Sequence, residues 1–153
     1  MRFVIIFLLI QLTGLVSCKK DLGIPWAEVP EMAKETFLSR YPEASNIIWQ
    51  KYYNQFHVNF TNNERISTAK FTASGDWLIT QTPILYADIP RPIIDSLRAS
   101  NYRNWVISDQ NSEETPKYGF LYRLIMYDNT ETKPLYYTLL GERIFKSYYN
   151  TDQ

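Results

Sequence analysis

The sequence predicts an α+β fold made of two tandem copies of one unit, a helix followed by antiparallel strands. Apolar residues recur at helical spacing in two places, residues 28–41 and 88–102. Each place is followed by a tryptophan-bearing segment and then by short runs in which apolar and polar residues alternate. Since one helix on four strands buries little apolar area, we expect the two units to share one continuous sheet and core.

The composition is that of one folded domain. The chain has 153 residues, of which 45% are hydrophobic and 21% charged, and 16 basic residues balance 16 acidic ones. This balance gives no net field to attract a nucleic acid, so a nucleic-acid partner is not expected. The aromatic content of 16%, with 12 Tyr and 4 Trp, favours strands or a binding surface.

The first residues are typical of a signal peptide. Arg2 precedes an apolar octet, Phe3–Ile10, which is too short to cross a bilayer because a membrane helix needs about 20 residues. The segment Leu15-Val16-Ser17-Cys18 resembles the lipobox of bacterial lipoproteins. The resemblance implies that residues 1–17 are removed and that Cys18 is diacylated on sulfur and acylated on its new amino terminus. Ordinary signal cleavage, with Cys18 incidental, is the alternative.

Lipidation of Cys18 limits the chemistry of the mature protein. Cys18 is the only cysteine, so the domain would hold no disulfide, no thiolate metal ligand and no cysteine nucleophile. Residues 18–27, short and polar with Gly23, are expected to form a tether between lipid and domain. The predicted location is the bacterial cell envelope, periplasmic or surface-exposed, with the protein lipid-anchored to a membrane.

The first helix is predicted over Glu28–Tyr41, with Pro30 as its first helical residue and Pro42 after its end. Its apolar residues at helical spacing are Val29, Met32, Ala33, Phe37 and Tyr41.

The second helix is predicted over Asp88–Tyr102, with Asp88 as its cap and with Pro90 and Pro92 in the first turn. Its apolar side consists of Ile89, Ile93, Ile94 and Leu97.

Four strands are predicted to follow the first helix. They are Ile47–Trp49, a strand in which Phe56, Val58 and Phe60 alternate with polar residues, Ile66–Phe71 and Trp77–Ile79, with turns at Asn62–Glu64 and Ser74–Asp76.

The second copy is predicted to run through Trp105–Ile107, an acidic loop Ser108–Lys117, Tyr118–Tyr127, a turn Asp128–Pro134, Leu135–Leu140 and Ile144–Tyr148. Placing Gly75 on Gly141 gives an offset of 66 residues between the copies, and placing Val29-Pro30 on Ile89-Pro90 gives an offset of 60.

This order of elements resembles the PepSY-like family of exported proteins, which are related in fold to the β-lactamase inhibitor protein. The resemblance rests on Val29-Pro30, the segment from Phe37 to Pro42, the strand Phe56–Phe60, the hairpin Phe71–Leu78 and their second-copy partners. It implies one curved sheet of about eight strands with helices on one face and an open concave face. It places the domain at residues 28–150, with repeats 28–86 and 87–150.

The resemblance implies a binding or inhibitory module without catalytic residues, and the residues agree. His57 is the only histidine and has no second His or Cys to complete a metal site or a catalytic pair. Glu113 and Glu114 are expected in a solvated loop, where nothing would separate their pKa values. The segment Asp128–Glu131 lacks the glycine and the final Glu of a calcium loop. No metal, cofactor or enzymatic activity is therefore expected.

The aromatic residues suggest where a partner binds. Strand alternation gives the first copy a polar side with His57, Asn59 and Lys70, whereas in the second copy both strand faces carry apolar residues. Longer or twisted strands, or cover by the acidic loop, are alternative explanations. The candidate partner-binding residues are Leu121, Arg123, Ile125, Tyr127, Tyr136, Thr138 and His57.

The function predicted from these observations is a non-enzymatic, lipid-anchored binding module of the cell envelope. We expect it to bind a protein, as a hydrolase inhibitor would, through the open sheet face. The alternative is a carrier or sensor of a small apolar or glycan ligand, which would stack on the same aromatic residues.

Overall fold

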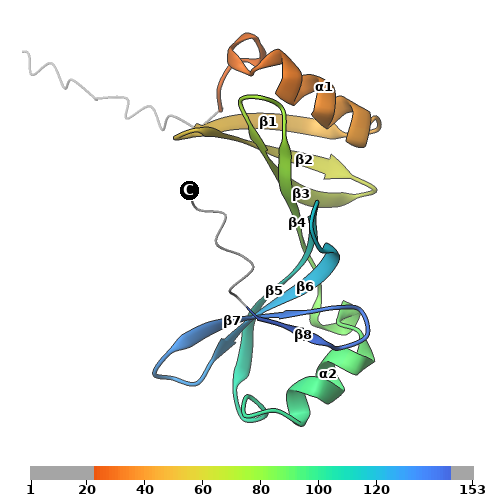
Figure 1. Cartoon of the computed structure of the whole chain (residues 1–153), viewed down its shortest axis with the longest axis vertical. Coiled ribbons are helices and arrows are strands. Elements are labelled where there is room, and N and C mark those ends of the chain that lie inside the picture. The colour runs from red at the N-terminus through yellow and green to blue at the C-terminus, as the bar shows by residue number, and fades with distance from the viewer. Residues whose placement is uncertain (1–22, 146–153) are drawn as a thin grey trace, which may run out of the picture.

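The computed structural model describes residues 23–145, which form one antiparallel sheet of eight strands in the order β1-β2-β3-β4-β5-β6-β7-β8 (Figure 1). The first copy consists of the short 3-10 helix η1 (Trp26–Glu28), α1 (Glu31–Arg40), β1 (Ser45–Tyr52), β2 (Gln55–Asn62), β3 (Arg65–Thr72) and β4 (Trp77–Pro83). The second consists of η2 (Tyr86–Asp88), α2 (Arg91–Arg98), β5 (Val106–Thr115), β6 (Gly119–Tyr127), β7 (Thr132–Tyr137) and β8 (Arg143–Ile144). The predicted fold class is confirmed.

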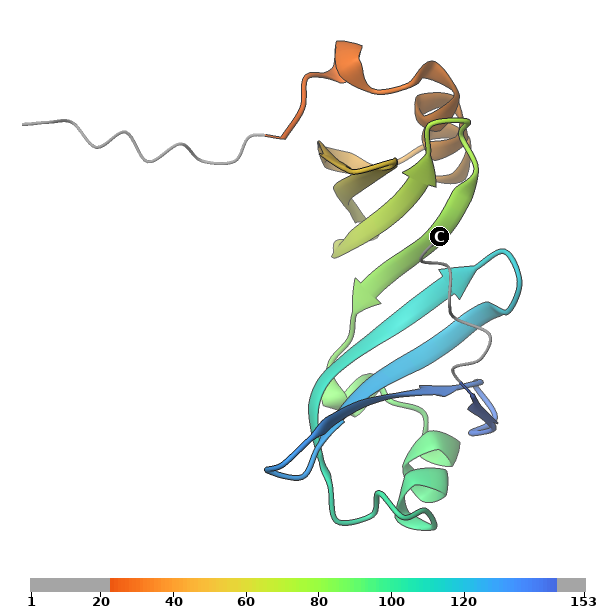
Figure 2. The ribbon, with the colours of Figure 1, turned by 60° about the vertical axis from the view of Figure 1, so that its left-hand side comes forward.

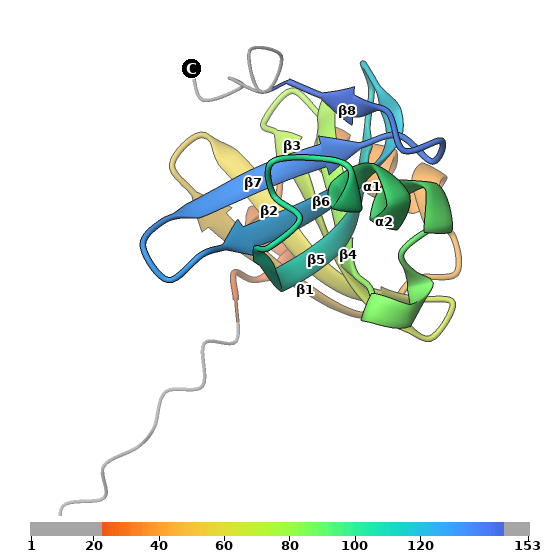
Figure 3. The ribbon, with the colours of Figure 1, turned by 90° about the horizontal axis from the view of Figure 1, so that it is seen from below.

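The two copies occupy opposite ends of an elongated molecule. In Figures 1 and 2, α1 lies at one end of the long axis and α2 at the other, and β4 runs between them. Seen along the long axis in Figure 3, β7 crosses the direction of β2, as expected for a sheet with a strong accumulated twist. The same face of the sheet continues from the first copy into the second. Ala69 lies opposite Thr80 and Thr80 lies opposite Glu114, and residues directly opposite each other in paired strands point to the same face.

Helix α1 begins one residue later than the sequence predicts. Pro30 is the N-cap and not the first helical residue, since its ψ of 136° is extended, and its carbonyl accepts the Lys34 N–H at 3.1 Å. The helix ends at Arg40, and its C-cap Tyr41 leaves helical geometry just before Pro42. Ala33 and Phe37 are buried as predicted, whereas Met32 is 54% exposed, so it does not belong to the apolar stripe.

Helix α2 is shorter than predicted, and Asp88 does not cap it. Asp88 ends η2 and pairs with Arg65 at 3.4 Å, while Pro90 takes the N-cap position. Ile89 is extended, with φ −71° and ψ 123°, because the residue before a proline avoids the helical region. This extended residue separates Asp88 from the helix.

The prediction of a loop over Ser108–Lys117 is wrong. Its first eight residues continue β5, which pairs with β4 through Glu113 and Glu114 and with β6 along its whole length. The buried side chains of this part of β5 are the polar Ser112, Glu113 and Thr115, so the strand forms without an alternating apolar pattern. Trp105, predicted as a strand residue, lies just before the strand.

Strand β7 lies earlier in the chain than predicted. The turn before it spans only residues 128–131, where the Asp128 carboxylate accepts the N–H groups of Thr130 and Glu131 at 2.9 Å. The apolar pair Leu139-Leu140, expected in the strand, lies exposed in the next turn. The turn predicted at Asn62–Glu64 is confirmed.

Each copy has its own hydrophobic core beneath its helix. In the first, Phe37 contacts the rings of Trp49, Phe60 and Phe71, with centroid separations of 5.1–6.2 Å. In the second, α2 packs on Leu124, Met126, Leu135 and Tyr137. One polar contact crosses between the copies, from Arg40 at the end of α1 to Glu114 on β5 at 3.1 Å, while Tyr41 with Thr80 and Ser67 with Thr82 tie β3, β4 and the end of α1 together within the first copy.

Parts of the sequence predictions concern residues outside 23–145. The signal peptide 1–17, Cys18 and most of the predicted strand Ile144–Tyr148 lie outside the described residues. Neither of the helices within the described range has the length and apolar character needed to cross a bilayer.

Candidate binding face

The candidate site lies on the sheet face opposite α1 and α2, which we call the open face. The register places Gln81 opposite Glu113, Glu113 opposite Leu121, and Arg123 opposite Tyr136 on this face. The open face therefore continues from the first copy into the second across the β4–β5 pairing. Within residues 23–145, both helices pack on the other face.

Glu113 lies at the centre of the open face and is 2% exposed. The amide nitrogen of Gln81 donates to its Oε1 at 2.7 Å, and Nε of Arg123 lies 3.8 Å from the same oxygen. No hydrogen-bond donor in the described part of the chain reaches Oε2. Burying a carboxylate costs free energy unless it is paired, so Arg123 is required next to it.

Arg123 is held between two acidic residues. Besides Glu113, its Nη1 lies 3.6 Å from Oδ2 of Asp109, and that oxygen accepts a hydrogen bond from the Asn111 amide at 2.9 Å. The Arg123 side chain remains 26% exposed. The guanidinium is therefore oriented by the sheet before any partner arrives, which lowers the entropic cost of binding.

Leu121 and Tyr136 form the floor beside Arg123. Leu121 is 1% exposed and Tyr136 is 8% exposed, although both lie on the open face and neither belongs to the cluster under α2. Burial raises the pKa of the Tyr136 hydroxyl, the negative charge of Glu113 raises it further, and Arg123 opposes both through its charge and a hydrogen bond. These two residues support the accessible side chains around them.

Ile125 and Tyr127 continue the same row along β6. Ile125 is half-buried opposite Pro134, and Tyr127 is 39% exposed opposite Thr132. Thr138 follows β7 and serves the turn, because its Oγ1 accepts the Glu142 N–H at 3.2 Å and its own N–H donates to the Glu142 carbonyl at 2.9 Å.

His57 is not brought together with the other candidates. It lies on β2, and β3, β4 and β5 separate it from β6. Its ring packs on Tyr52 with centroids 4.6 Å apart, and its Nε2 lies 3.3 Å from Oε1 of Gln55. Partial burial lowers the pKa of His57, and the neighbouring Lys70 charge lowers it further. His57 is thus a half-buried residue of the first copy's polar open face.

The central acidic residues were missed at the sequence level. The sequence pattern predicts a solvated loop for Glu113 and Asp109 and does not point to Gln81. The internal repeat carried the missing signal, because the 60-residue offset that relates the helices also relates β1 to residues 105–112, where a strand of equal length was due.

The described residues do not bring together the groups that a metal site or an activated nucleophile would need. Across residues 23–145, no group of three His, Cys, Asp or Glu side chains could hold a metal ion. Glu113 and Arg123 neutralise each other, and His57 faces Lys70 and Gln55 without a carboxylate to orient it.

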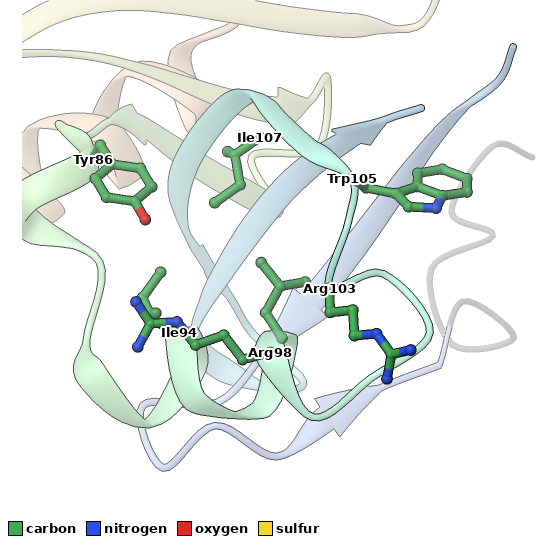
Figure 4. Close-up of a pocket in the computed structure, with 7 residues that line it drawn as sticks. Tyr86, Ile94, Arg98, Arg103, Trp105 and Ile107 are labelled. Carbon is green, nitrogen blue, oxygen red and sulfur yellow. The ribbon is translucent and has the colours of Figure 1, made fainter. Parts of the chain in front are cut away.

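A small cavity lies on the other side of the sheet, between η2, α2 and the start of β5. Its volume is about 170 Å³, and its walls are Tyr86, Ile94, Leu97, Arg98, Arg103, Trp105 and Ile107. Figure 4 shows Tyr86 and Arg98 along one side and Arg103 and Trp105 along the other. This volume is below the roughly 300 Å³ at which drug-sized ligand sites begin, so the cavity suits only a small group.

Similar solved structures share the fold. A BLIP-like protein from Bacteroides fragilis matches with a TM-score of 0.68 and 21% identity, covering 74% of this chain and 82% of that one. A DUF2874 family protein from Bacteroides ovatus matches with a TM-score of 0.66 and 24% identity, covering 76% and 84%. A candidate periplasmic protein from Bacteroides eggerthii matches with a TM-score of 0.65 and 18% identity, covering 80% and 94%.

The sequence comparisons add no further relative. No protein-family model matches the chain, and no curated protein matches it. At these identities the solved structures establish the fold alone, which is that of the BLIP-like proteins.

Proposed function

We propose that this protein is a non-enzymatic, lipid-anchored binding module of the bacterial cell envelope that binds a protein through its open face. The observation that carries the proposal is Arg123, which is fixed between Glu113 and Asp109 above a buried floor of Leu121 and Tyr136. A preoriented arginine surrounded by apolar and aromatic side chains is the composition of an interface centre.

The accessible contact residues are Arg123, Ile125 and Tyr127, with His57 on the first copy's part of the face. They lie on one face of the sheet, and neither α1 nor α2 covers that face. The residues Leu121 and Tyr136 would act indirectly, by holding β6 and β7 in place, and Thr138 by closing the turn after β7.

The first residues of the chain support the proposed location. The apolar segment before Cys18 and the lipobox-like Leu15-Val16-Ser17-Cys18 support export and lipidation. The neighbour from Bacteroides eggerthii supports a periplasmic location. Inhibition of an envelope hydrolase is the specific form of binding that the BLIP-like neighbour suggests, by analogy of fold.

The test is capture of the partner in the native envelope, followed by a comparison of two matched variants. Tyr127→Ala removes an exposed ring from the open face, while Phe120→Ala removes an exposed ring from the same strand on the opposite face. A partner captured by crosslinking and identified should bind the Tyr127→Ala protein at least tenfold more weakly and the Phe120→Ala protein unchanged. Equal retention of both variants would refute binding through the open face.

The alternative, a carrier of a small ligand, has one observation in its favour. The cavity beside α2 combines apolar walls with two guanidinium groups, which suits a small apolar molecule with an anionic end. A persistent extra mass in native mass spectrometry of protein purified from its host, lost in an Ile94→Trp variant that fills the cavity, would favour this function over protein binding.

A further inference from the structure

The first described residues are fixed on the outer edge of the sheet. The Ile24 N–H donates to the Trp49 carbonyl of edge strand β1 at 2.7 Å. Gly23 has a φ of +76°, and a Cβ at this position would lie 2.2 Å from the Trp49 oxygen and 2.9 Å from the Ile48 side chain. Only glycine fits so close to the strand, so the chain joins the folded domain at one defined point.

The position of this point limits how far the domain can lie from a lipid on Cys18. Five peptide units separate Cys18 from Gly23, and a fully extended chain of five residues spans at most about 17 Å. With Cys18 acylated, the edge of β1 must lie within that distance of the bilayer surface. The far edge of the sheet is seven strand spacings away, roughly 34 Å along the sheet.

The surface around this point carries exposed aromatic and apolar side chains. Trp26 is 46% exposed, Ile48 42%, Tyr52 48% and Tyr53 96%. Trp26 packs edge-on against Trp49 with centroids 6.4 Å apart, so its ring is held in place while half of it faces outward. Tyr52 and Tyr53 form the end of β1 and its turn, close along the strand from Trp49.

Tryptophan and tyrosine are the residues that favour the interface between membrane and water, because their rings are apolar and their N–H and O–H groups stay hydrated. Lys51 is exposed beside Tyr52 and could meet anionic headgroups. The ammonium of Lys34, 5.4 Å from the centre of the Trp26 ring, is buried and paired with Glu31 at 2.8 Å, so it holds the ring in place. Exposed rings and one exposed lysine therefore lie along the β1 edge, where the chain enters the fold.

We propose that the β1 edge, with Trp26, Ile48, Tyr52 and Tyr53, is a membrane-contact surface that rests on the bilayer. This proposal depends on the proposed lipid anchor and goes beyond it, because a lipid alone would leave the domain free to turn. The contact directs the second copy, with Arg123 and Tyr127, away from the membrane and toward a partner.

The experiment compares two reporter positions in the acylated protein. Tyr53→Cys places a thiol in the proposed contact, and Leu140→Cys places one in the exposed turn between β7 and β8, 73% exposed, at the other end of the sheet. Acylated Cys18 leaves the new cysteine as the single free thiol. Each variant carries the same fluorophore and is reconstituted in phosphatidylethanolamine and phosphatidylglycerol vesicles (3:1) with headgroup-labelled nitroxide lipid.

The expected result is at least twofold quenching of the fluorophore at position 53 and almost none at position 140. Equal quenching, or stronger quenching at 140, would overturn the membrane-contact surface. Mass spectrometry of the same protein reports the acyl chains. An acylated protein with equal quenching removes this proposal and leaves the lipid anchor standing, whereas an unacylated mature protein removes both.

Discussion

Gly141 lies so close to the start of α2 that an added Cβ would be 2.5 Å from the carbonyl oxygen of Pro92. The first copy repeats this relationship, since a Cβ on Gly75 would be 2.8 Å from the carbonyl oxygen of Met32. Both glycines have a positive φ, 80° and 89°. The turn before the last strand of each copy therefore packs directly on the backbone of that copy's helix.

Replacing Gly141 with alanine should destabilise the protein by about 2–4 kcal/mol, because the new Cβ meets both a positive φ and a rigid backbone neighbour. Gly119 is the matched control. Its φ is +64°, and within the described part of the chain nothing lies within 4 Å of an added Cβ. Gly119→Ala should cost about 1 kcal/mol. Urea unfolding measures both, and equal losses would contradict close packing of Gly141 on α2.

Thr80 should be more important to stability than its size suggests. Its buried hydroxyl bonds with the Tyr41 hydroxyl at 2.5 Å and accepts the Trp77 indole N–H at 2.9 Å. Thr80→Val should lower the free energy of unfolding by about 2 kcal/mol, since two polar groups lose their shared partner. Tyr41→Phe leaves the Trp77 bond in place and should cost about 1 kcal/mol. A loss in Tyr41→Phe as large as that in Thr80→Val would contradict the role of Thr80 as the shared partner of two polar groups.

His57 should titrate below its ordinary pKa of 6.5, because burial and Lys70 disfavour its protonated form. The unfolded chain then binds more protons than the folded one between the lowered pKa and 6.5, so stability is complete above 6.5 and falls as the pH drops through that window. NMR follows the single histidine directly. Lys70→Gln should raise the pKa of His57 toward 6.5, while Lys133→Gln, at the far end of the sheet, should not change it.

The matching stability measurement uses His57→Gln. Urea unfolding at pH 7 and pH 5.5 should show a smaller loss of stability in this variant than in the unchanged protein, since other groups titrate equally in both. An identical loss in the two proteins would mean that His57 has the same pKa folded and unfolded.

The helices, the repeat and most strands follow from the sequence because apolar spacing records burial directly. Phe56, Val58 and Phe60 are buried, and Ile89, Ile93 and Leu97 cover the second core. Strand β5 does not follow from the sequence, because its buried side chains, Ser112, Glu113 and Thr115, are polar and give no apolar alternation. The Glu113–Arg123 pair does not follow from the sequence either. An ion pair between two strands depends on their register, which residue types alone do not give.

The sequence predicts which residues share the candidate face, but not how deeply each of them is buried. Alternation placed Arg123, Ile125 and Tyr127 correctly on one surface, but it gave no information about how deeply Leu121 and Tyr136 lie within it. Burial of a sheet face depends on twist and on neighbouring chain segments, which are properties of the assembled sheet.

The order of the strands in the sheet is the same as their order in the chain. Within residues 23–145 each strand pairs only with its neighbours in the chain, and every pairing except β4 with β5, which η2 and α2 connect, closes a short loop and loses little chain entropy. Proteins built from such local contacts fold faster than β-proteins that join distant segments. A newly made chain can therefore assemble strand by strand, with few unpaired edges left to aggregate along the way.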